Sequence, residues 1–278
     1  MIFLILAICS SAMVALVMRT AQTKVSNPTG LLAANYIVCV LMGLILSIPE
    51  ATGGSFRGFP FSAGLGIFNG GIYLGSFVLM QHSTRRNGVV LSSMFMKLGV
   101  LVSTFVSILC FGETPTLPHL LGFALAVLSI LIINYSRDMA FTRNSWILIV
   151  MLFMSGMTDV MSKIYDSFGN TSLENTFLLF TFFSALCLCL GFMKHKQEHL
   201  GKQELLYGAL LGIPNFLSSL FLLKALSHIP AMIAFPTFNV AVILVVALAG
   251  MLIFRERLSR RQILGGLLIC IALVLLNL

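Results

Sequence analysis

The sequence predicts an all-α integral membrane protein with ten transmembrane helices, arranged as two inverted five-helix repeats. Composition, ten apolar windows and a match between the two halves of the chain lead to this prediction. Of the 278 residues, 58% are hydrophobic and only 9% are charged, and the mean hydropathy is +1.02. An average soluble domain is about half apolar and roughly a quarter charged. The chain therefore has too few polar side chains to cover a soluble globule.

Ten windows are apolar over roughly 17 residues or more, which is the length of a transmembrane helix. Membrane β-strands instead alternate over about ten residues, so the windows favour helices. No basic residue precedes the first window, which we interpret as a span rather than a secretory signal. The predicted spans are 2–18, 29–48, 61–80, 88–110, 117–134, 145–163, 173–193, 204–223, 229–253 and 262–277.

The second half of the chain matches the first at an offset of 143 residues. In this register Glu113 aligns with Glu256, and Gly122 aligns with Gly265. An odd number of spans in each half means that the second copy enters the membrane inverted, as in many secondary transporters. We therefore predict a first repeat over 1–134, a connecting loop over 135–144 and a second repeat over 145–278.

The basic residues are distributed as an inverted repeat requires. The loops after the odd-numbered spans hold 13 Lys and Arg residues, and the loops after the even-numbered spans hold three. By the positive-inside rule, both termini lie outside the cell. We attribute the net charge of +8 to membrane orientation rather than to nucleic-acid binding. The six Cys and five His residues show no metal-binding pattern, and no catalytic motif is present, so we predict neither an enzyme nor a metal or cofactor site.

Three segments carry a resemblance to a known family: 111–115 with Gly122 behind it, its copy 254–258 with Gly265, and 224–231. They resemble the EamA-type ten-helix members of the drug/metabolite transporter superfamily, and the resemblance covers essentially the whole chain. It implies a carrier with a central cavity lined by both halves, which moves small metabolites by alternating access, often as an exporter. It also implies cytoplasmic termini, opposite to the charge count, so the orientation stays open.

Charged residues inside the spans are the first candidates for function. Lys97 lies nine residues into the fourth predicted span, where a charge costs roughly 2.5–3.5 kcal/mol. We interpret Lys97 as an anion-binding group; the alternative is a snorkelling lysine, or one paired with Asp159 or a backbone carbonyl. Asp159 and Lys163 lie four residues apart and can pair on one helix face, with Arg19 as the equivalent of Lys163. A gate between the halves is the alternative role for these three residues.

Helix breakers at matching positions of two halves often mark the binding site of a transporter. Pro214 aligns with Gly71, and Pro236 aligns with Ser93, so we predict hinges at Gly71, Pro214 and Pro236. Polar and aromatic side chains beside them predict a substrate site, with packing and interhelical hydrogen bonds as the alternative. Together with Lys97, the predicted substrate-binding residues are Asn69, Tyr73, Ser93, Asn215, Phe216 and Asn239. The GxxxG motifs of the third and eighth spans predict internal packing, with dimerisation as the alternative.

We expect a secondary transporter in the inner (plasma) membrane of a bacterium. Its expected partners are a small-molecule substrate and the lipid bilayer, with no nucleic acid, and it is expected to be a monomer or a homodimer. A lysine rather than an acid at the centre favours an anionic or zwitterionic metabolite such as an amino acid. The alternatives are a passive channel or facilitator, and a membrane scaffold that transports nothing.

Overall fold

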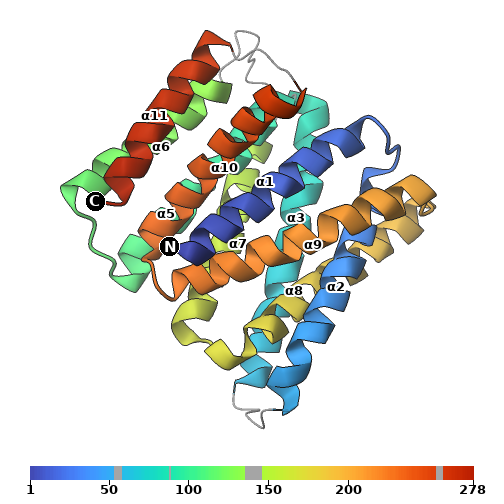
Figure 1. The fold of residues 1–278 in the computed structure, drawn as a ribbon. Helices are drawn as coiled ribbons and strands as arrows, with labels where there is room; N and C mark the ends of the chain where they lie inside the picture. Colours follow the sequence, from blue (N-terminus) through green and yellow to red (C-terminus); the bar gives the residue numbers. More distant parts are fainter. Residues whose placement is uncertain (53–57, 88, 135–145, 255–258) are drawn as a thin grey trace. The chain divides into compact units, whose positions relative to one another are not determined.

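The computed structural model describes residues 1–52, 58–87, 89–134, 146–254 and 259–278. All regular secondary structure in this part of the chain is helical (Figure 1). The helices are α1 (Ile2–Gln22), α2 (Pro28–Thr52), α3 (Phe59–Asn87), α4 (Val89–Lys97), α5 (Val100–Phe111), α6 (Leu117–Asn134), α7 (Trp146–Phe168), the 3-10 turn η1 (Thr171–Leu173), α8 (Glu174–Lys196), α9 (Lys202–Leu226), α10 (Ala231–Phe254) and α11 (Arg260–Leu276).

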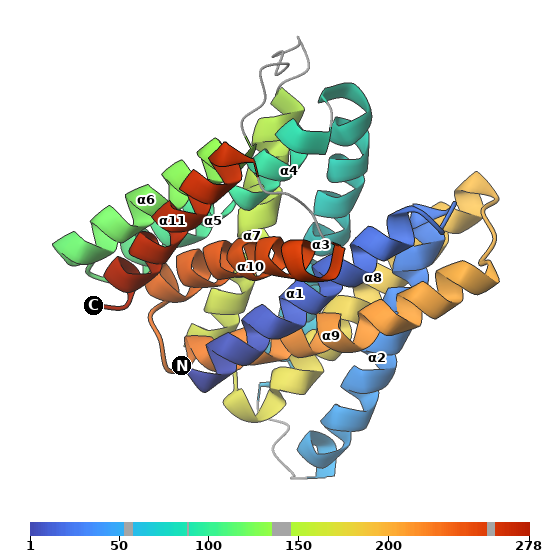
Figure 2. The ribbon, with the colours of Figure 1, turned by 45° about the horizontal axis from the view of Figure 1, so that its top comes forward.

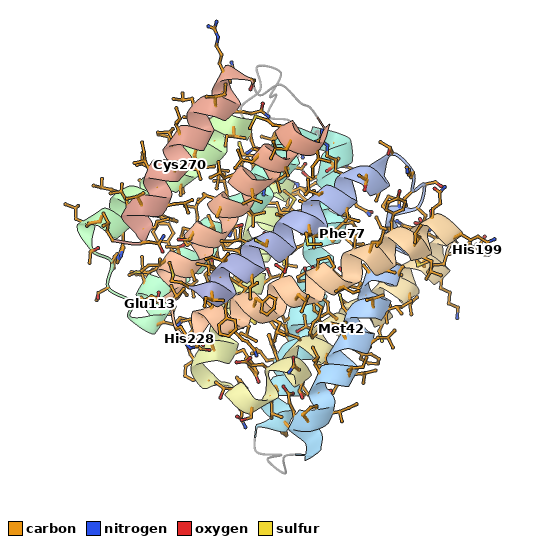
Figure 3. The ribbon with its side chains drawn as sticks, in the orientation of Figure 1. Met42, Phe77, Glu113, His199, His228 and Cys270 are labelled. Carbon is orange, nitrogen blue, oxygen red and sulfur yellow. The ribbon has the colours of Figure 1, made fainter. Side chains whose placement is uncertain are left out.

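The helices have the length and surface of membrane spans. Among the described residues, nine segments are long and apolar enough to cross a bilayer, and α4 with α5 forms one of them. The tenth, α11, has 17 residues, at the short end of the usual range. Large apolar side chains point outwards along these helices, as with Leu109 and Leu252, which are 79% and 82% exposed. Figure 3 shows side chains such as Cys270 projecting from the helices. The predicted fold class is confirmed, and the chain is a multi-pass integral membrane protein.

The helices form two compact units, and each unit combines helices from both halves of the sequence. Unit 1 comprises Met1–Leu74 and Ile164–Ser227, and unit 2 comprises Gly75–Lys163 and His228–Leu278. Unit 1 contains α1, α2, α8 and α9 with the first part of α3, whereas unit 2 contains α4, α5, α6, α10 and α11 with most of α7. The predicted boundary at 135–144 lies outside the described residues, so the division into two sequence repeats stays a prediction about the sequence.

In unit 2 the last helices of the two halves, α6 and α11, lie side by side (Figures 1 and 2) and pack through equivalent contacts. Gly122 of α6 lies against Leu276 of α11, and Gly265 of α11 lies against Ile133 of α6. The offset of 143 residues that aligns the two glycines also aligns Ile133 with Leu276. This reciprocity is the contact pattern of two helices related by a two-fold axis, as an inverted repeat requires.

Unit 1 repeats the pattern with two of the three GxxxG motifs; the third, Gly71 with Gly75, is divided between the two units. The four glycines are Gly66 and Gly70 on α3, and Gly208 and Gly212 on α9. The first glycine of each motif lies against a backbone nitrogen of a neighbouring helix. Gly66 of α3 lies against the nitrogen of Thr181 on α8, and Gly208 of α9 lies against the nitrogen of Asn35 on α2. The second glycine of each motif lies against the carbonyl oxygen of the same residue. The motifs therefore pack helices within the chain, because only glycine lets the backbones approach so closely.

Two adjacent glycines of α3 allow a test of this packing. A Cβ at position 70 would lie 2.8 Å from Ser184 Cβ and closer still to the Thr181 carbonyl, whereas a Cβ at position 71 would meet nothing within 4 Å. Gly70→Ala is expected to destabilise the protein by about 1–3 kcal/mol through overpacking. Gly71→Ala is expected to leave stability unchanged or to raise it slightly, because alanine favours the helix. Apparent melting temperatures in detergent check this, and equal values for both variants would contradict the packing described.

Candidate functional site

The fourth predicted span is interrupted between α4 and α5, directly after Lys97. At this point the N–H groups of Gly99, Leu101 and Val102 bond to carbonyls three residues back, at 2.9–3.2 Å, instead of four residues back as in an α-helix. The hydroxyl of Ser155 on α7 donates to the Met96 carbonyl at 2.9 Å. The backbones of α5 and α7 come close here, because Gly99 lies against Gly156. Interrupted spans of this kind are where transporters commonly bind substrates and ions.

Lys97 ends α4 at this interruption, and its side chain is half-buried. Within the described part of the chain, no hydrogen bond or ion pair to its ammonium group is found, and Asp159 is not its partner. A charge in a membrane protein is costly unless a partner compensates it. The ammonium group of Lys97 can therefore receive an anionic group from outside the chain.

The interruption does not lie at the predicted hinges. Helix α3 continues through Gly71, α9 continues through Pro214 and α10 continues through Pro236. Gly99 was the missed signal, since a glycine inside a helix lowers its stability. Two predicted substrate residues lie on these unit 2 helices. Ser93 is half-buried on α4, and Asn239 donates to the Phe235 carbonyl of its own helix at 3.0 Å.

Four of the predicted substrate residues come together in unit 1. The Tyr73 hydroxyl donates to Asn215 Oδ1 at 3.4 Å, and the Phe216 ring centroid lies 5.9 Å from that of Phe182. The Asn69 amide donates to Thr181 Oγ1 at 3.5 Å, which is the long limit of a hydrogen bond. These side chains come from α3, α8 and α9.

Three further members of this group were not predicted from the sequence. The Asn215 amide donates to Asn35 Oδ1 on α2 at 3.3 Å. Tyr36, also on α2, is 1% exposed, and its ring centroid lies 6.2 Å from those of Tyr73 and Phe182. We call the whole group the aromatic–amide cluster; it comprises Asn35, Tyr36, Asn69, Tyr73, Phe182, Asn215 and Phe216.

The aromatic–amide cluster lies on the repeat axis of unit 1. The contacts of the GxxxG motifs relate α3 to α9 by 142 residues, one fewer than the offset of 143 in the sequence alignment, so Gly71 does not correspond to Pro214 in the structure. In this structural register Tyr73 corresponds to Asn215, and the two residues touch each other. Asn35 and Thr181 are equivalent because the glycines of α9 and α3 lie against their backbones. Tyr36 and Phe182 are the next residues along the chain, so they are equivalent too, and their rings are in contact. Equivalent residues can meet only at the axis that relates the repeats. Inverted-repeat transporters bind their substrates at the repeat interface.

Two polar groups of the cluster lack partners within the described residues. Asn69 Oδ1 is buried and accepts no hydrogen bond. The Tyr36 hydroxyl likewise forms no hydrogen bond there, although its side chain is buried. Buried polar groups are normally hydrogen-bonded, and exceptions need an explanation such as a bound water or ligand. The cluster therefore has hydrogen-bonding capacity for a polar molecule that the chain itself does not supply.

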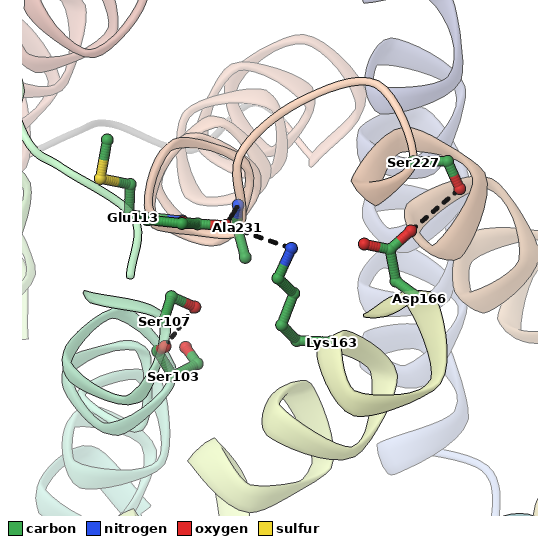
Figure 4. A network of polar contacts seen from close by, with 8 residues as sticks. Ser103, Ser107, Glu113, Lys163, Asp166, Ser227 and Ala231 are labelled. Carbon is green, nitrogen blue, oxygen red and sulfur yellow. Dashed lines mark hydrogen bonds and ion pairs between the residues drawn. The ribbon is translucent and has the colours of Figure 1, made fainter. Parts of the chain in front are cut away.

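The ion pair of Lys163 differs from the expected one. Lys163 Nζ lies 3.2 Å from Glu113 Oε1 (Figure 4), rather than pairing with Asp159. The Glu113 carboxylate also accepts the N–H groups of Ala231 and Met232, at 2.9 and 2.8 Å. The carboxylate therefore balances the charge of Lys163 and also caps the first turn of α10, where the helix dipole favours an anion. Lys163 therefore pairs with Glu113, which is distant in sequence and also caps α10, instead of with Asp159 on its own helix.

The remaining charged candidates lie elsewhere. Arg19, the repeat equivalent of Lys163, lies in the last turn of α1 in unit 1. Glu256, the equivalent of Glu113, lies in 255–258, outside the described residues. Asp159 is half-buried on α7 beside Ser103, whose hydroxyl interacts with its carboxylate.

Comparison with known proteins agrees with these observations. An uncharacterized protein of Haemophilus influenzae is 24% identical over 275 residues, which cover 94% of this chain and 92% of the relative. A crystal structure with 15% sequence identity matches 99% of this chain and 98% of its own, with a TM-score of 0.78, and so shares the fold. The model of the EamA-like transporter family matches residues 1–135 and again 143–278. The chain therefore belongs to the EamA-like transporter family, and it is a membrane transporter of the drug/metabolite type.

Proposed function

We propose that the protein is a secondary transporter that exports a small anionic or zwitterionic metabolite, such as an amino acid, across the bacterial inner membrane by alternating access. The observation that carries this proposal is the aromatic–amide cluster on the repeat axis, with hydrogen-bonding groups that its own residues leave unsatisfied. A few polar groups placed among aromatic side chains are typical of small-molecule binding sites.

The chemistry of the cluster suits a molecule that is polar at one end and apolar at the other. The Asn69 carbonyl accepts hydrogen bonds, and the Tyr36 hydroxyl can donate or accept one. The rings of Tyr73 and Phe182 offer apolar faces and can also receive an ammonium group by cation–π attraction. Lys97 of unit 2 is a separate candidate: its ammonium group has no partner within the described residues and favours a negative group.

Two buried tyrosines of unit 1 allow a matched test. Tyr36 and Tyr165 are 1% and 2% exposed, but the Tyr165 hydroxyl donates to the Asn170 carbonyl at 2.7 Å. Tyr36→Phe is expected to leave stability unchanged and to weaken substrate binding roughly 3- to 10-fold, the equivalent of one neutral hydrogen bond. Tyr165→Phe is expected to lower stability and leave binding unchanged. Binding is measured as thermal stabilisation of the purified protein by a panel of amino acids, carboxylates and amines.

Counterflow of the stabilising compound in proteoliposomes then separates a carrier from a channel. A carrier shows saturable exchange that Tyr36→Phe weakens, whereas a channel shows flux that rises linearly with concentration. Stabilisation by amines alone, or a Tyr36→Phe variant with unchanged affinity for every compound that stabilises the wild type, would contradict the proposed substrate site.

A further inference from the structure

Asp159 is an intramembrane carboxylate without a charged partner in the described part of the chain. It lies on α7, within the candidate span Trp146–Phe168, and it is half-buried. Lys163, one turn further on, is engaged by Glu113. A carboxylate at such a position costs several kcal/mol if it is ionised and unpaired. Its charge therefore needs compensation by something that the chain does not provide.

Unit 2 also contains hydroxyl groups that lack partners. Ser103 on α5 interacts with the Asp159 carboxylate. Thr104 on α5 and Thr237 on α10 are 3% and 5% exposed, and their hydroxyl oxygens have no hydrogen-bond partner within the described residues. Two buried threonine hydroxyls without partners are as unusual as the carboxylate itself.

The hydrogen bonds of Glu113 place these groups at one depth. Glu113 follows the end of α5 and accepts N–H groups from the first turn of α10. Because α5 and α10 also pack on each other, the two helices run antiparallel from this junction. Thr104 lies about two turns before the end of α5 and Thr237 about two turns after the start of α10, which brings them to the same level. Asp159 is close to Ser103, the residue that precedes Thr104 on α5.

We propose that Asp159 is the binding site of a coupling cation, either a proton or Na⁺, with the hydroxyls of Thr104 and Thr237 completing the site. Carboxylate and hydroxyl oxygens are hard donors suited to small hard cations. A bound cation neutralises the carboxylate, and its release towards the other side of the membrane couples substrate movement to the cation gradient. The inference adds a driving ion to the proposed transport function and rests on that function.

The charged groups near this part of α7 are few. Lys163 is on α7 itself, Glu113 follows α5, and Lys97 ends α4 one and a half turns before Ser103. Helix α10 carries no ionisable side chain from Ala231 to Phe254. Helix α3 packs on α7 at Gly75, against Met154. Apart from Tyr73, which belongs to unit 1, the titratable side chains of α3 begin at His82, about two turns beyond that contact. Glu113 and Lys163 neutralise each other, so Asp159 is left as the group whose charge changes with the cation.

Infrared difference spectroscopy on the purified protein without substrate tests the site. In the wild type, raising the pH is expected to remove the carbonyl band of a protonated carboxyl group, and this band is expected to be missing in Asp159→Asn. Asp166→Asn is the matched control, since Asp166 lies two turns further along α7 and accepts a hydrogen bond from Ser227 at 3.0 Å. If Na⁺ is the ligand, adding NaCl instead of KCl removes the band or shifts the carboxylate bands in the wild type and not in Asp159→Asn.

Two further measurements keep the proposal testable if one variant fails to fold. Thr237→Val is expected to weaken cation affinity roughly 3- to 10-fold through the loss of one hydroxyl. In proteoliposomes, Asp159→Asn is expected to retain substrate exchange and to lose accumulation driven by an imposed pH or Na⁺ gradient. Identical cation-dependent spectra for the wild type and Asp159→Asn would overturn the site. Absence of any exchange by the wild type would instead count against the proposed transport function.

Discussion

Lys97→Ala is expected to reduce transport of an anionic or zwitterionic substrate roughly a hundredfold. A hundredfold loss is about 2.7 kcal/mol, within the range of about 2–5 kcal/mol that is usual for removing one partner of a desolvated charge pair. The reason is that the ammonium of Lys97 has no acidic partner within the described residues, so its pairing energy is available to a bound anion. Initial rates of substrate exchange in proteoliposomes measure the effect.

The variant should also keep its fold. Removing a charge that has no partner relieves a desolvation cost, so the apparent melting temperature is expected to stay unchanged or to rise. Lys202→Ala is the matched control, because Lys202 is exposed at the start of α9. Normal transport by Lys97→Ala would show that Lys97 does not bind the substrate. Faster transport of a cationic compound by this variant would show that the lysine excludes cations.

Loss of the Glu113 carboxylate is expected to destabilise the protein more than any other single change discussed above. Glu113→Ala removes the partner of Lys163 and the acceptor for two N–H groups of α10. Breaking a buried ion pair by removing one partner costs about 3–5 kcal/mol, and losing a helix cap adds about 1 kcal/mol. Because Glu113 and Lys163 are each 12% exposed, we expect roughly 3 kcal/mol in total, measured as the change in unfolding free energy in mixed micelles.

A double-mutant cycle separates the two contributions. Glu113→Gln keeps a carbonyl acceptor for α10 but leaves Lys163 unpaired, so it is expected to lose stability, although less than Glu113→Ala. Adding Lys163→Met to Glu113→Gln is expected to restore part of that loss, because no unpaired charge remains. Strict additivity of the two substitutions would show that the ion pair at 3.2 Å contributes nothing.

Hydropathy predicted the spans because apolar length alone decides whether a helix can cross a bilayer. It did not predict the interruption after Lys97, since α4 and α5 together remain apolar over the full width. The interruption depends on tertiary contacts, namely the approach of Gly156 to Gly99 and the Ser155 hydroxyl that bonds to the Met96 carbonyl. A sequence does not show which glycine will face another backbone.

Part of the aromatic–amide cluster was predictable because helix breakers and amides stand together in the third and eighth spans. This pattern predicts Tyr73 and Asn215 as substrate residues, and the structure brings them into contact. Tyr36 and Phe182 were missed because they differ in type and because the second and seventh spans align at a different spacing from the other spans. The pairing of Lys163 with Glu113 was not predicted for a similar reason. It depends on how the end of α5 packs against the start of α10, and the spacing of residues along one helix carries no information about that contact.

The interleaving of the two halves has a consequence for how the chain originated and how it can be divided. Helix α2 packs on α8 and α9, and α6 packs on α11, so each of these helices finds its neighbours in the other half. The predicted duplication implies an ancestor with one repeat, which could bury the same faces by inserting into the membrane in both orientations and assembling with itself. For the same reason, a chain severed between α6 and α7 can regain its structure only when both fragments are made together.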